Sequence, residues 1–335
     1  MRTLFWMSFL GMSCVTLDPV LPFFNPIHCS DVSEETCDPS HPKFADDSDP
    51  VWDLACTPCD EAYDWNKEYP WRAFTLDGET TDVRGVPEDQ VERQTFKIQG
   101  GKELDAYFIT SHGEIEELAT TTIVLNHGNF VGIEHYLPRI RFLYELGYNI
   151  YVWDYRGFGK SIPTDPPTLP QMMSDARDAF EHASTLSPDE NKMIIYGMSI
   201  GGMAAGEMAA TFDGCAQMFE AAYNSVTAKI ETNMSLSLPG SFLTSGVAEN
   251  DVKLRDTQTP TLIMHGDNDN RIHIDEARRL YKSLPETTPS KMVIIKNAGH
   301  GLGGERGGVP EQGLQAYGDI MMSFLEQHAP GCLSE

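Results

Sequence analysis

One pentapeptide, Gly197-Met198-Ser199-Ile200-Gly201, constrains the fold of this chain more than any other stretch. The apolar run at 192–196 before it predicts a buried strand, and the Ala- and Met-rich run at 202–211 after it predicts a helix. A strand that turns directly into a helix has no room for side chains beside the turn, so the two glycines permit a strained corner. Such a corner lifts the Ser199 hydroxyl above the sheet edge, in front of a helix N-terminus that favours developing negative charge. The sequence therefore predicts that Ser199 is a nucleophile rather than a buried hydroxyl in a turn.

The segments on both sides of this corner alternate between strand and helix patterns. An antiparallel pair of strands is expected at 91–98 and 104–109, around Gly100-Gly101. We expect further strands at 121–125, 148–153, 216–219, 261–265 and 292–296, and helices at 133–146, 172–184, 275–283 and 311–327. This alternation predicts a doubly wound, mostly parallel eight-stranded α/β sheet within a catalytic domain at residues 91–330.

A serine nucleophile needs a base and an acid that orients the base. His300 follows the expected strand at 292–296 in a Gly-flanked loop, at the strand end where α/β sheets place their sites. The turn after the strand at 261–265 carries two candidate acids, Asp267 and Asp269. We favour Asp269, because a carboxylate just past the turn can reach back to the base, whereas Asp267 would stabilise the turn. The chain order Ser199, Asp269, His300 is that of one hydrolase superfamily.

An oxyanion hole needs two backbone N–H groups aimed at one point. The Ile200 N–H, at the start of the helix, is the first candidate. The second should come from the loop at 126–130, where Gly128 permits close approach and Asn129 is a better placed donor than Phe130. His127 precedes the nucleophile strand, and we interpret it as a brace of this loop rather than as the base.

From about residue 91 to residue 328 the chain resembles the α/β-hydrolase superfamily, and within it the small serine hydrolases related to monoacylglycerol lipases and serine aminopeptidases. The motifs that carry the resemblance occur in the family's order: His127-Gly128-Asn129, Asp154-Tyr155-Arg156-Gly157-Phe158-Gly159-Lys160-Ser161, the pentapeptide around Ser199, His265-Gly266-Asp267-Asn268-Asp269, and Gly299-His300. The resemblance implies an α/β-hydrolase fold and a triad, and we expect no metal and no cofactor. It leaves the substrate open, because this family hydrolyses esters, lipids, peptides and thioesters.

The segment at 220–259 is too short for a large helical lid, so we expect a short insert in its place. The rim of an apolar acyl-binding pocket is expected to include Phe130 and Met198. Leu236, Leu238 and Phe242 could join this rim or form the core of the short insert.

Residues 1–14 predict a signal peptide: Arg2 precedes an apolar stretch at 4–12 that is too short to span a bilayer. The stretch ends at Cys14 after a small residue, which resembles a bacterial lipoprotein cleavage site, although Gly11 stands where that pattern prefers Leu. We therefore expect an exported protein, either secreted or attached to a membrane through a lipidated Cys14. The net charge of −26 argues against a nucleic-acid partner.

Between this signal and the catalytic domain, residues 15–90 form a leader with nine of the 21 prolines. We interpret it as an irregular, disulfide-stapled cover on the catalytic domain; binding of a wall polymer is the alternative. Apart from Cys14, six cysteines remain, an even number that suits disulfides outside the cytosol: Cys29, Cys37, Cys56, Cys59, Cys215 and Cys332. The C-x-x-C at 56–59 also leaves a zinc site or a redox dithiol open. Cys215 could bridge to Cys332 or remain a free thiol in the core.

These features favour an exported serine hydrolase that cleaves small-molecule or lipid esters through an acyl-enzyme. A serine peptidase is the first alternative, and a surface binding protein on the hydrolase scaffold is the second. The presence of Ser199, Asp269 and His300 together favours an enzyme, because a binding scaffold has no need of all three.

Overall fold

A computed structural model describes residues 28–31, 57–66, 74–76, 79–81, 84–129, 132–225, 248–300 and 314–334. The predicted signal peptide with Cys14 lies outside these residues, as do Cys37, Cys56 and Phe130. The same holds for most of the short insert, including Leu236, Leu238 and Phe242. These expectations therefore stay predictions.

Eight strands form one sheet in the order β10-β9-β8-β7-β5-β6-β4-β3. Their bounds are β3 (Val91–Lys97), β4 (Glu103–Ile109), β5 (Thr122–Asn126), β6 (Asn149–Trp153), β7 (Met193–Met198), β8 (Ala216–Glu220), β9 (Thr261–Gly266) and β10 (Ser290–Ile295). Strand β4 pairs antiparallel with β3 and β6, and every other pair is parallel. The predicted mostly parallel eight-stranded sheet is confirmed, with the nucleophile strand β7 at its centre.

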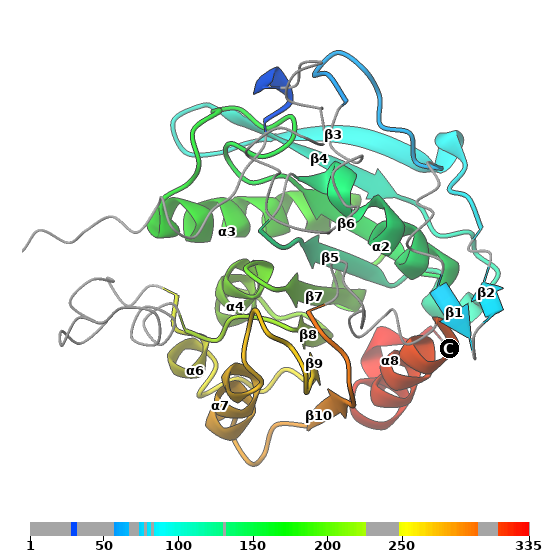
Figure 1. The fold of residues 1–335 in the computed structure, drawn as a ribbon, viewed down its shortest axis with the longest axis vertical. Helices are drawn as coiled ribbons and strands as arrows, with labels where there is room; N and C mark the ends of the chain where they lie inside the picture. The colour runs from blue at the N-terminus through cyan, green and yellow to red at the C-terminus, as the bar shows by residue number, and fades with distance from the viewer. Residues whose placement is uncertain are drawn as a thin grey trace, which may run out of the picture.

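Helices cover both faces of this sheet, and the apolar core is accordingly divided in two. Side chains of α2 (Ile133–Glu145) and α8 (Leu314–His328) pack on one face, and those of α3 (Leu169–Leu186), α4 (Gly201–Thr211) and α7 (Asp275–Ser283) pack on the other. Figure 1 shows the two sets on opposite sides of the sheet, together with the short α6 (Asn250–Lys253) beside α4. The fold is the doubly wound one that the alternation predicts.

Helix α3 starts three residues before its expected start because Thr168 caps it. The Gln171 N–H donates to Thr168 Oγ1 at 3.3 Å, and the Gln171 side chain accepts from the Thr168 N–H at 2.8 Å. This reciprocal pair is a capping box, and Pro170 in the first turn also favours the helix.

The leader contains a short antiparallel pair, β1 (Phe74–Leu76) and β2 (Glu79–Thr81). The prediction of an irregular leader is therefore wrong for these residues, because three-residue strands are too short to leave a periodic pattern. Single turns of 3-10 helix complete the described elements: η1 (Cys29–Asp31), η3 (Glu88–Gln90), η4 (Glu116–Leu118), η5 (Glu190–Lys192) and η8 (Pro330–Cys332).

A disulfide between Cys29 and Cys59 staples two pieces of the leader together. Both pieces contact the loop after β6: the Cys29 N–H donates to the Gly159 carbonyl at 2.7 Å, and Lys160 Nζ donates to the Glu61 carbonyl. The predicted stapling is confirmed for this pair of cysteines.

The leader also contributes two aromatic side chains to the core beside β4. The rings of Tyr63 and Trp65 are buried, with centroids 5.5 and 5.1 Å from that of Tyr107. Thr57 Oγ1 donates to the carboxylate of Glu134 at 2.6 Å, which ties the leader to the start of α2. These contacts place the described residues 57–65 of the leader on the catalytic domain, and the interpretation of the whole leader as a cover stays a prediction.

A second disulfide joins Cys215, just before β8, to Cys332 in η8. The alternative of a free Cys215 thiol is therefore wrong. The bridge closes a loop of 117 residues and attaches the end of the chain to the sheet.

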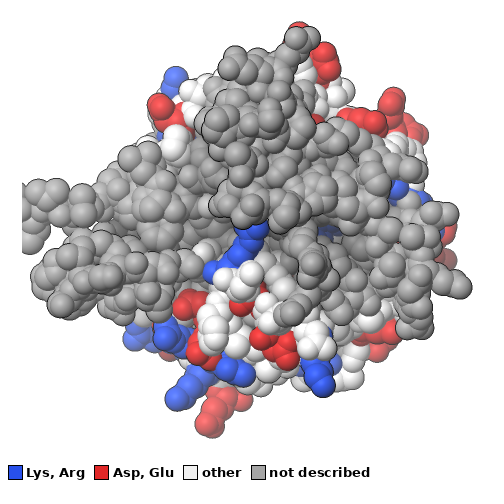
Figure 2. Space-filling view, in the orientation of Figure 1, with Lys and Arg blue, Asp and Glu red and all other residues white. Residues whose placement is uncertain are grey.

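The surface of the described part carries both signs of charge, and Figure 2 shows acidic side chains on several parts of this face with Lys and Arg among them. Within the described ranges, no helix has the length and apolar character that a bilayer crossing requires.

We expect the double variant Cys215→Ser/Cys332→Ser to lower the free energy of unfolding by about 2–4 kcal/mol, because the cross-link restricts the unfolded chain. Urea unfolding of both proteins without reductant measures the difference. Addition of dithiothreitol should shift the wild-type transition toward that of the variant. Equal midpoints for wild type and variant would contradict a stabilising bridge.

Candidate active site

Ser199 stands at the sharp corner between β7 and α4 with a φ of 54°, in the left-handed region that residues other than glycine seldom adopt. The corner also brings backbone atoms close together: a Cβ at Gly201 would lie 2.1 Å from the Asn126 carbonyl oxygen. This close approach is the steric reason for the glycine that the pentapeptide predicts.

Hydrogen bonds from neighbouring segments hold the strained corner. The Ser199 N–H donates to the Glu220 carbonyl at 3.1 Å, and the Ser199 carbonyl accepts from the N–H groups of Gly202 and Tyr223 at 3.1 and 3.0 Å. Glu220 ends the adjacent strand β8, so the sheet itself fixes the position of the serine.

The structure brings the three predicted triad residues together at the carboxyl ends of parallel strands. His300 Nε2 lies 3.0 Å from Ser199 Oγ, and His300 Nδ1 lies 2.7 Å from Asp269 Oδ2. A proton on Nδ1 bonds to the carboxylate and leaves the Nε2 lone pair facing the serine hydroxyl. Ser199, Asp269 and His300 are 5%, 7% and 8% exposed, so water screens these contacts little.

Hydrogen bonds keep Asp269 ionised in spite of its burial. Burial alone would raise the pKa of the Asp269 carboxyl, but bonds from His265, His300 and the Ile272 N–H hold that pKa well below its ordinary value. A carboxylate in this state can orient His300 and stabilise the imidazolium that forms when the base accepts a proton.

Asp269, rather than Asp267, contacts the base. Asp267 Oδ1 instead accepts the Asn297 N–H at 2.6 Å, in the loop that leads to His300. Asp267 thus stabilises the loop of the base, and its predicted role in its own turn stays a prediction.

Sequence reasoning missed a second histidine beside the acid. His265 Nε2 lies 2.8 Å from the Ile272 carbonyl and 3.4 Å from Asp269 Oδ2, and its side chain is fully buried. The motif His265-Gly266-Asp267-Asn268-Asp269 already contained the signal for this contact, because His265 stands four residues before the acid in the sequence.

The loop after β5 lies against the nucleophile, as the predicted oxyanion hole requires. A Cβ at Gly128 would lie 3.2 Å from Ser199 Cβ and 2.5 Å from Tyr136 Oη. Asn129 follows Gly128, and Ile200 follows Ser199 at the N-cap of α4. Their N–H groups as oxyanion donors stay a prediction.

The remaining site residues occupy buried positions. Met198 is fully buried in the core on the α2 side, and its place on a pocket rim stays a prediction. His127 Nδ1 donates to the Gly128 carbonyl at 2.8 Å, in agreement with a brace rather than a base.

Among the described residues, one cluster has the donor types of a metal site: His28, Cys29 and Cys59. The two sulfur atoms in it are bonded to each other. Cys29 and Cys59 therefore form a disulfide instead of contributing to the zinc site that the sequence left open.

We expect Asp269→Asn to lower kcat by about 10³–10⁴-fold, because an amide can donate to Nδ1 and favour the wrong tautomer of His300. Asp267→Asn is the matched control, and it should cost less because Asp267 contacts only the loop. Initial rates on a p-nitrophenyl ester measure both. A larger loss in Asp267→Asn would reverse the assignment of the acid.

Two protein families match separate parts of the chain. The family described as "Serine aminopeptidase, S33" matches residues 118–222, and the "Prolyl oligopeptidase family" matches residues 243–329. Among relatives, YfhR of Escherichia coli O157:H7 is 28% identical over 215 residues, which cover 62% of this chain and 73% of YfhR.

Solved structures share the fold. The Pyrococcus furiosus esterase Pf2001 superposes with a TM-score of 0.56 at 18% identity, over 73% of this chain and 96% of the esterase. The Pyrococcus horikoshii acylaminoacyl peptidase superposes with a TM-score of 0.53 at 20% identity, over 71% of this chain and 41% of the peptidase. Esterases and peptidases are thus both similar to this chain.

Proposed function

We propose that this chain is a serine hydrolase of the α/β-hydrolase superfamily that cleaves carboxylic esters through an acyl-enzyme on Ser199. One observation carries the proposal: Ser199 Oγ, the His300 ring and the Asp269 carboxylate form a hydrogen-bonded line with distances of 3.0 and 2.7 Å. Residues of suitable chemistry thus occupy the positions of a nucleophile, a base and an orienting acid.

The proposed reaction has two halves. In the first, Ser199 Oγ attacks the ester carbonyl carbon while its proton passes to His300 Nε2, and the negative oxygen of the tetrahedral intermediate accepts hydrogen bonds from the N–H groups of Ile200 and Asn129. The C–O bond to the alcohol then breaks, and the alcohol oxygen takes the proton from His300. In the second half, water attacks the acyl-enzyme with His300 again as base, and the acid product leaves with Ser199 restored.

Amide cleavage is the second candidate, because the similar structures include a peptidase. An aminopeptidase must bind the substrate's ammonium group, usually with a carboxylate. Glu276 is near enough to raise the pKa of Tyr223 beside the site, though less than burial and Asp269 do. Its carboxylate accepts the N–H groups of Asn224 and Ser225, both at 3.2 Å. These bonds fix the position of the Glu276 carboxylate but leave it acceptor capacity, so hydrolysis of aminoacyl anilides tests whether it can also bind a substrate ammonium group.

An exported location belongs to the same proposal. The disulfides Cys29–Cys59 and Cys215–Cys332 suit an oxidising compartment, in which such bonds form and persist. Attachment to a membrane would depend on Cys14.

We expect a fluorophosphonate probe to label wild-type protein and not Ser199→Ala. The variant should also lose at least about 10³-fold in turnover, because the covalent route needs the Ser199 hydroxyl. In-gel fluorescence measures labelling, and p-nitrophenyl esters of increasing chain length, assayed beside aminoacyl anilides, measure turnover.

The panel of esters and anilides separates an esterase from a peptidase and from a binding protein. Faster cleavage of anilides than of esters would make the protein a peptidase, and a wild-type protein that neither labels nor turns over would favour a binding protein. Near-normal turnover by Ser199→Ala would contradict the mechanism itself.

A further inference from the structure

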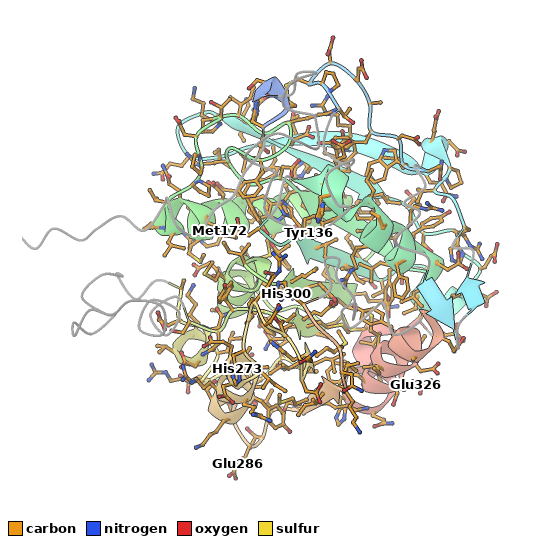
Figure 3. The ribbon with its side chains drawn as sticks, in the orientation of Figure 1. Tyr136, Met172, His273, Glu286, His300 and Glu326 are labelled. Carbon is orange, nitrogen blue, oxygen red and sulfur yellow. A yellow bond between two sulfur atoms is a disulfide. The ribbon has the colours of Figure 1, made fainter. Side chains whose placement is uncertain are left out.

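His127 is a buried titratable residue that the proposed reaction does not use. It follows β5 and directly precedes Gly128 and Asn129. We refer to these three residues, His127, Gly128 and Asn129, as the oxyanion loop. A Cβ at Gly128 would lie 2.5 Å from Tyr136 Oη and 3.2 Å from Ser199 Cβ, so this part of the fold lies close to the proposed triad; Figure 3 labels Tyr136 and His300 near the centre of the molecule.

Both nitrogens of the His127 ring face groups that only accept hydrogen bonds. Nδ1 lies 2.8 Å from the Gly128 carbonyl oxygen, and Nε2 lies 3.3 Å from Asp154 Oδ1. The Nε2 contact has an ion-pair distance but makes no hydrogen bond in the structure. A carbonyl and an ionised carboxylate have no hydrogen to donate, so an ion pair at this contact requires a proton on each ring nitrogen.

Aromatic rings surround His127 on several sides. The centroids of Tyr155, Tyr136 and Phe158 lie 4.2, 5.2 and 5.7 Å from that of the imidazole, and Tyr155 is stacked on it. The faces of aromatic rings attract cations at these distances. The Tyr155 hydroxyl also donates to the His127 carbonyl at 2.7 Å, which fixes the backbone of the histidine.

Asp154 contacts both the oxyanion loop and the start of α2. Its Oδ1 atom accepts the N–H of Ile133, the first residue of α2, at 2.8 Å, and the same atom faces His127, which begins the oxyanion loop. The turn after β6 is shaped around this carboxylate: Gly159 has a φ of 49°, and a Cβ there would lie 2.0 Å from Asp154 Oδ2. These contacts give a physical role to the motif that begins at Asp154.

The titratable groups around Asp154 come from β4, from α2, from the leader and from the turn of Asp154 itself. Asp105 lies on β4, and its burial and then the negative charge of Asp154 raise its pKa to about 6. Lys160 lies in the turn after β6, where burial lowers its pKa while Asp105, Glu134 and Asp154 act in the opposite direction. From α2, Glu134 and Tyr136 face the cluster, and Tyr63 faces it from the leader. Tyr155 packs from the turn itself.

We propose that His127 and Asp154 form a buried ion pair that holds the oxyanion loop against Ser199. Both are positioning residues, because they act on the reaction only through the loop. This inference rests on the proposed function, since it assumes that N–H groups of the loop stabilise the oxyanion.

The kinetic test uses Asp154→Asn, which keeps the shape of the side chain and an acceptor for Ile133 but removes the negative charge. We expect kcat on a p-nitrophenyl ester to fall about 10–100-fold, because loss of a single oxyanion donor costs about 10²–10³-fold and a displaced loop loses part of that. KM should change less than about threefold. The rate of fluorophosphonate labelling should fall with kcat, because the phosphonyl oxygen occupies the same hole.

Asp175→Asn is the matched control. Asp175 is as buried as Asp154, and it binds Arg156 of the same turn at 2.6 and 2.8 Å. Its substitution removes an ion pair from this turn without a contact to the oxyanion loop, so kcat should stay within about threefold of wild type. An equal loss of kcat in the two variants, after correction for active sites by titration, would overturn the inference.

A spectroscopic test needs no folded Asp154 variant. The ring nitrogens of 15N-histidine-labelled full-length protein are observed by NMR at neutral pH, and the His127 signals are assigned by their absence in His127→Gln. We expect both nitrogens to carry hydrogen. A His127 ring with only one protonated nitrogen would overturn the ion pair. This outcome includes the case in which the second proton resides on Asp154.

The two proposals can fail separately. If wild-type protein labels at Ser199 but Asp154→Asn behaves like Asp175→Asn, the positioning role alone is wrong. If wild-type protein neither labels nor turns over, the proposed function is wrong, and the positioning role that assumes it is overturned with it.

Discussion

The corner at Ser199 is the constraint on which the rest of the structure depends. A non-glycine residue with a φ of 54° costs about 1–3 kcal/mol, and it persists only when its surroundings fix it. Here the surroundings are the central strand β7, the helix α4 and the backbone of Glu220 on the adjacent strand. Burial of both faces of the sheet offsets this local cost, and the corner then presents one hydroxyl to the ends of β9 and β10.

A buried hydrogen-bond network around Glu220 supports the corner at Ser199. The Glu220 backbone carbonyl accepts the Ser199 N–H, and the Glu220 side chain accepts bonds from Arg139 at 2.5 Å, from Tyr317 at 2.9 Å and from Tyr196. These partners come from α2, α8 and β7, so three elements meet at one carboxylate next to the nucleophile. Removal of Arg139 would take the positive charge of this ion pair away from the buried Glu220 carboxylate, which makes Arg139 costly to change.

Much of the fold could be predicted because its signals are local. The eight strands, the long helices and the corner at Ser199 each follow from an apolar period or from glycine spacing. The acid was harder to predict, since Asp267 and Asp269 stand two residues apart and only the reach to His300 distinguishes them. The remaining features of the fold and of the candidate site depend on contacts between segments that are distant in the sequence. The Cys215–Cys332 bridge spans 117 residues, and the bonds from His265 to the acid and from Asp154 to the start of α2 appear only after the strands are aligned.

The central claim is that an acyl group resides on Ser199 during turnover. Acid quenching of the enzyme in the steady state with a p-nitrophenyl ester, followed by peptide mapping with mass spectrometry, tests this most directly. The account predicts an added acyl mass on the peptide that contains Ser199, whose size follows the acyl chain of the substrate. Turnover with an unmodified Ser199 peptide, or with the acyl group on another residue, would contradict it.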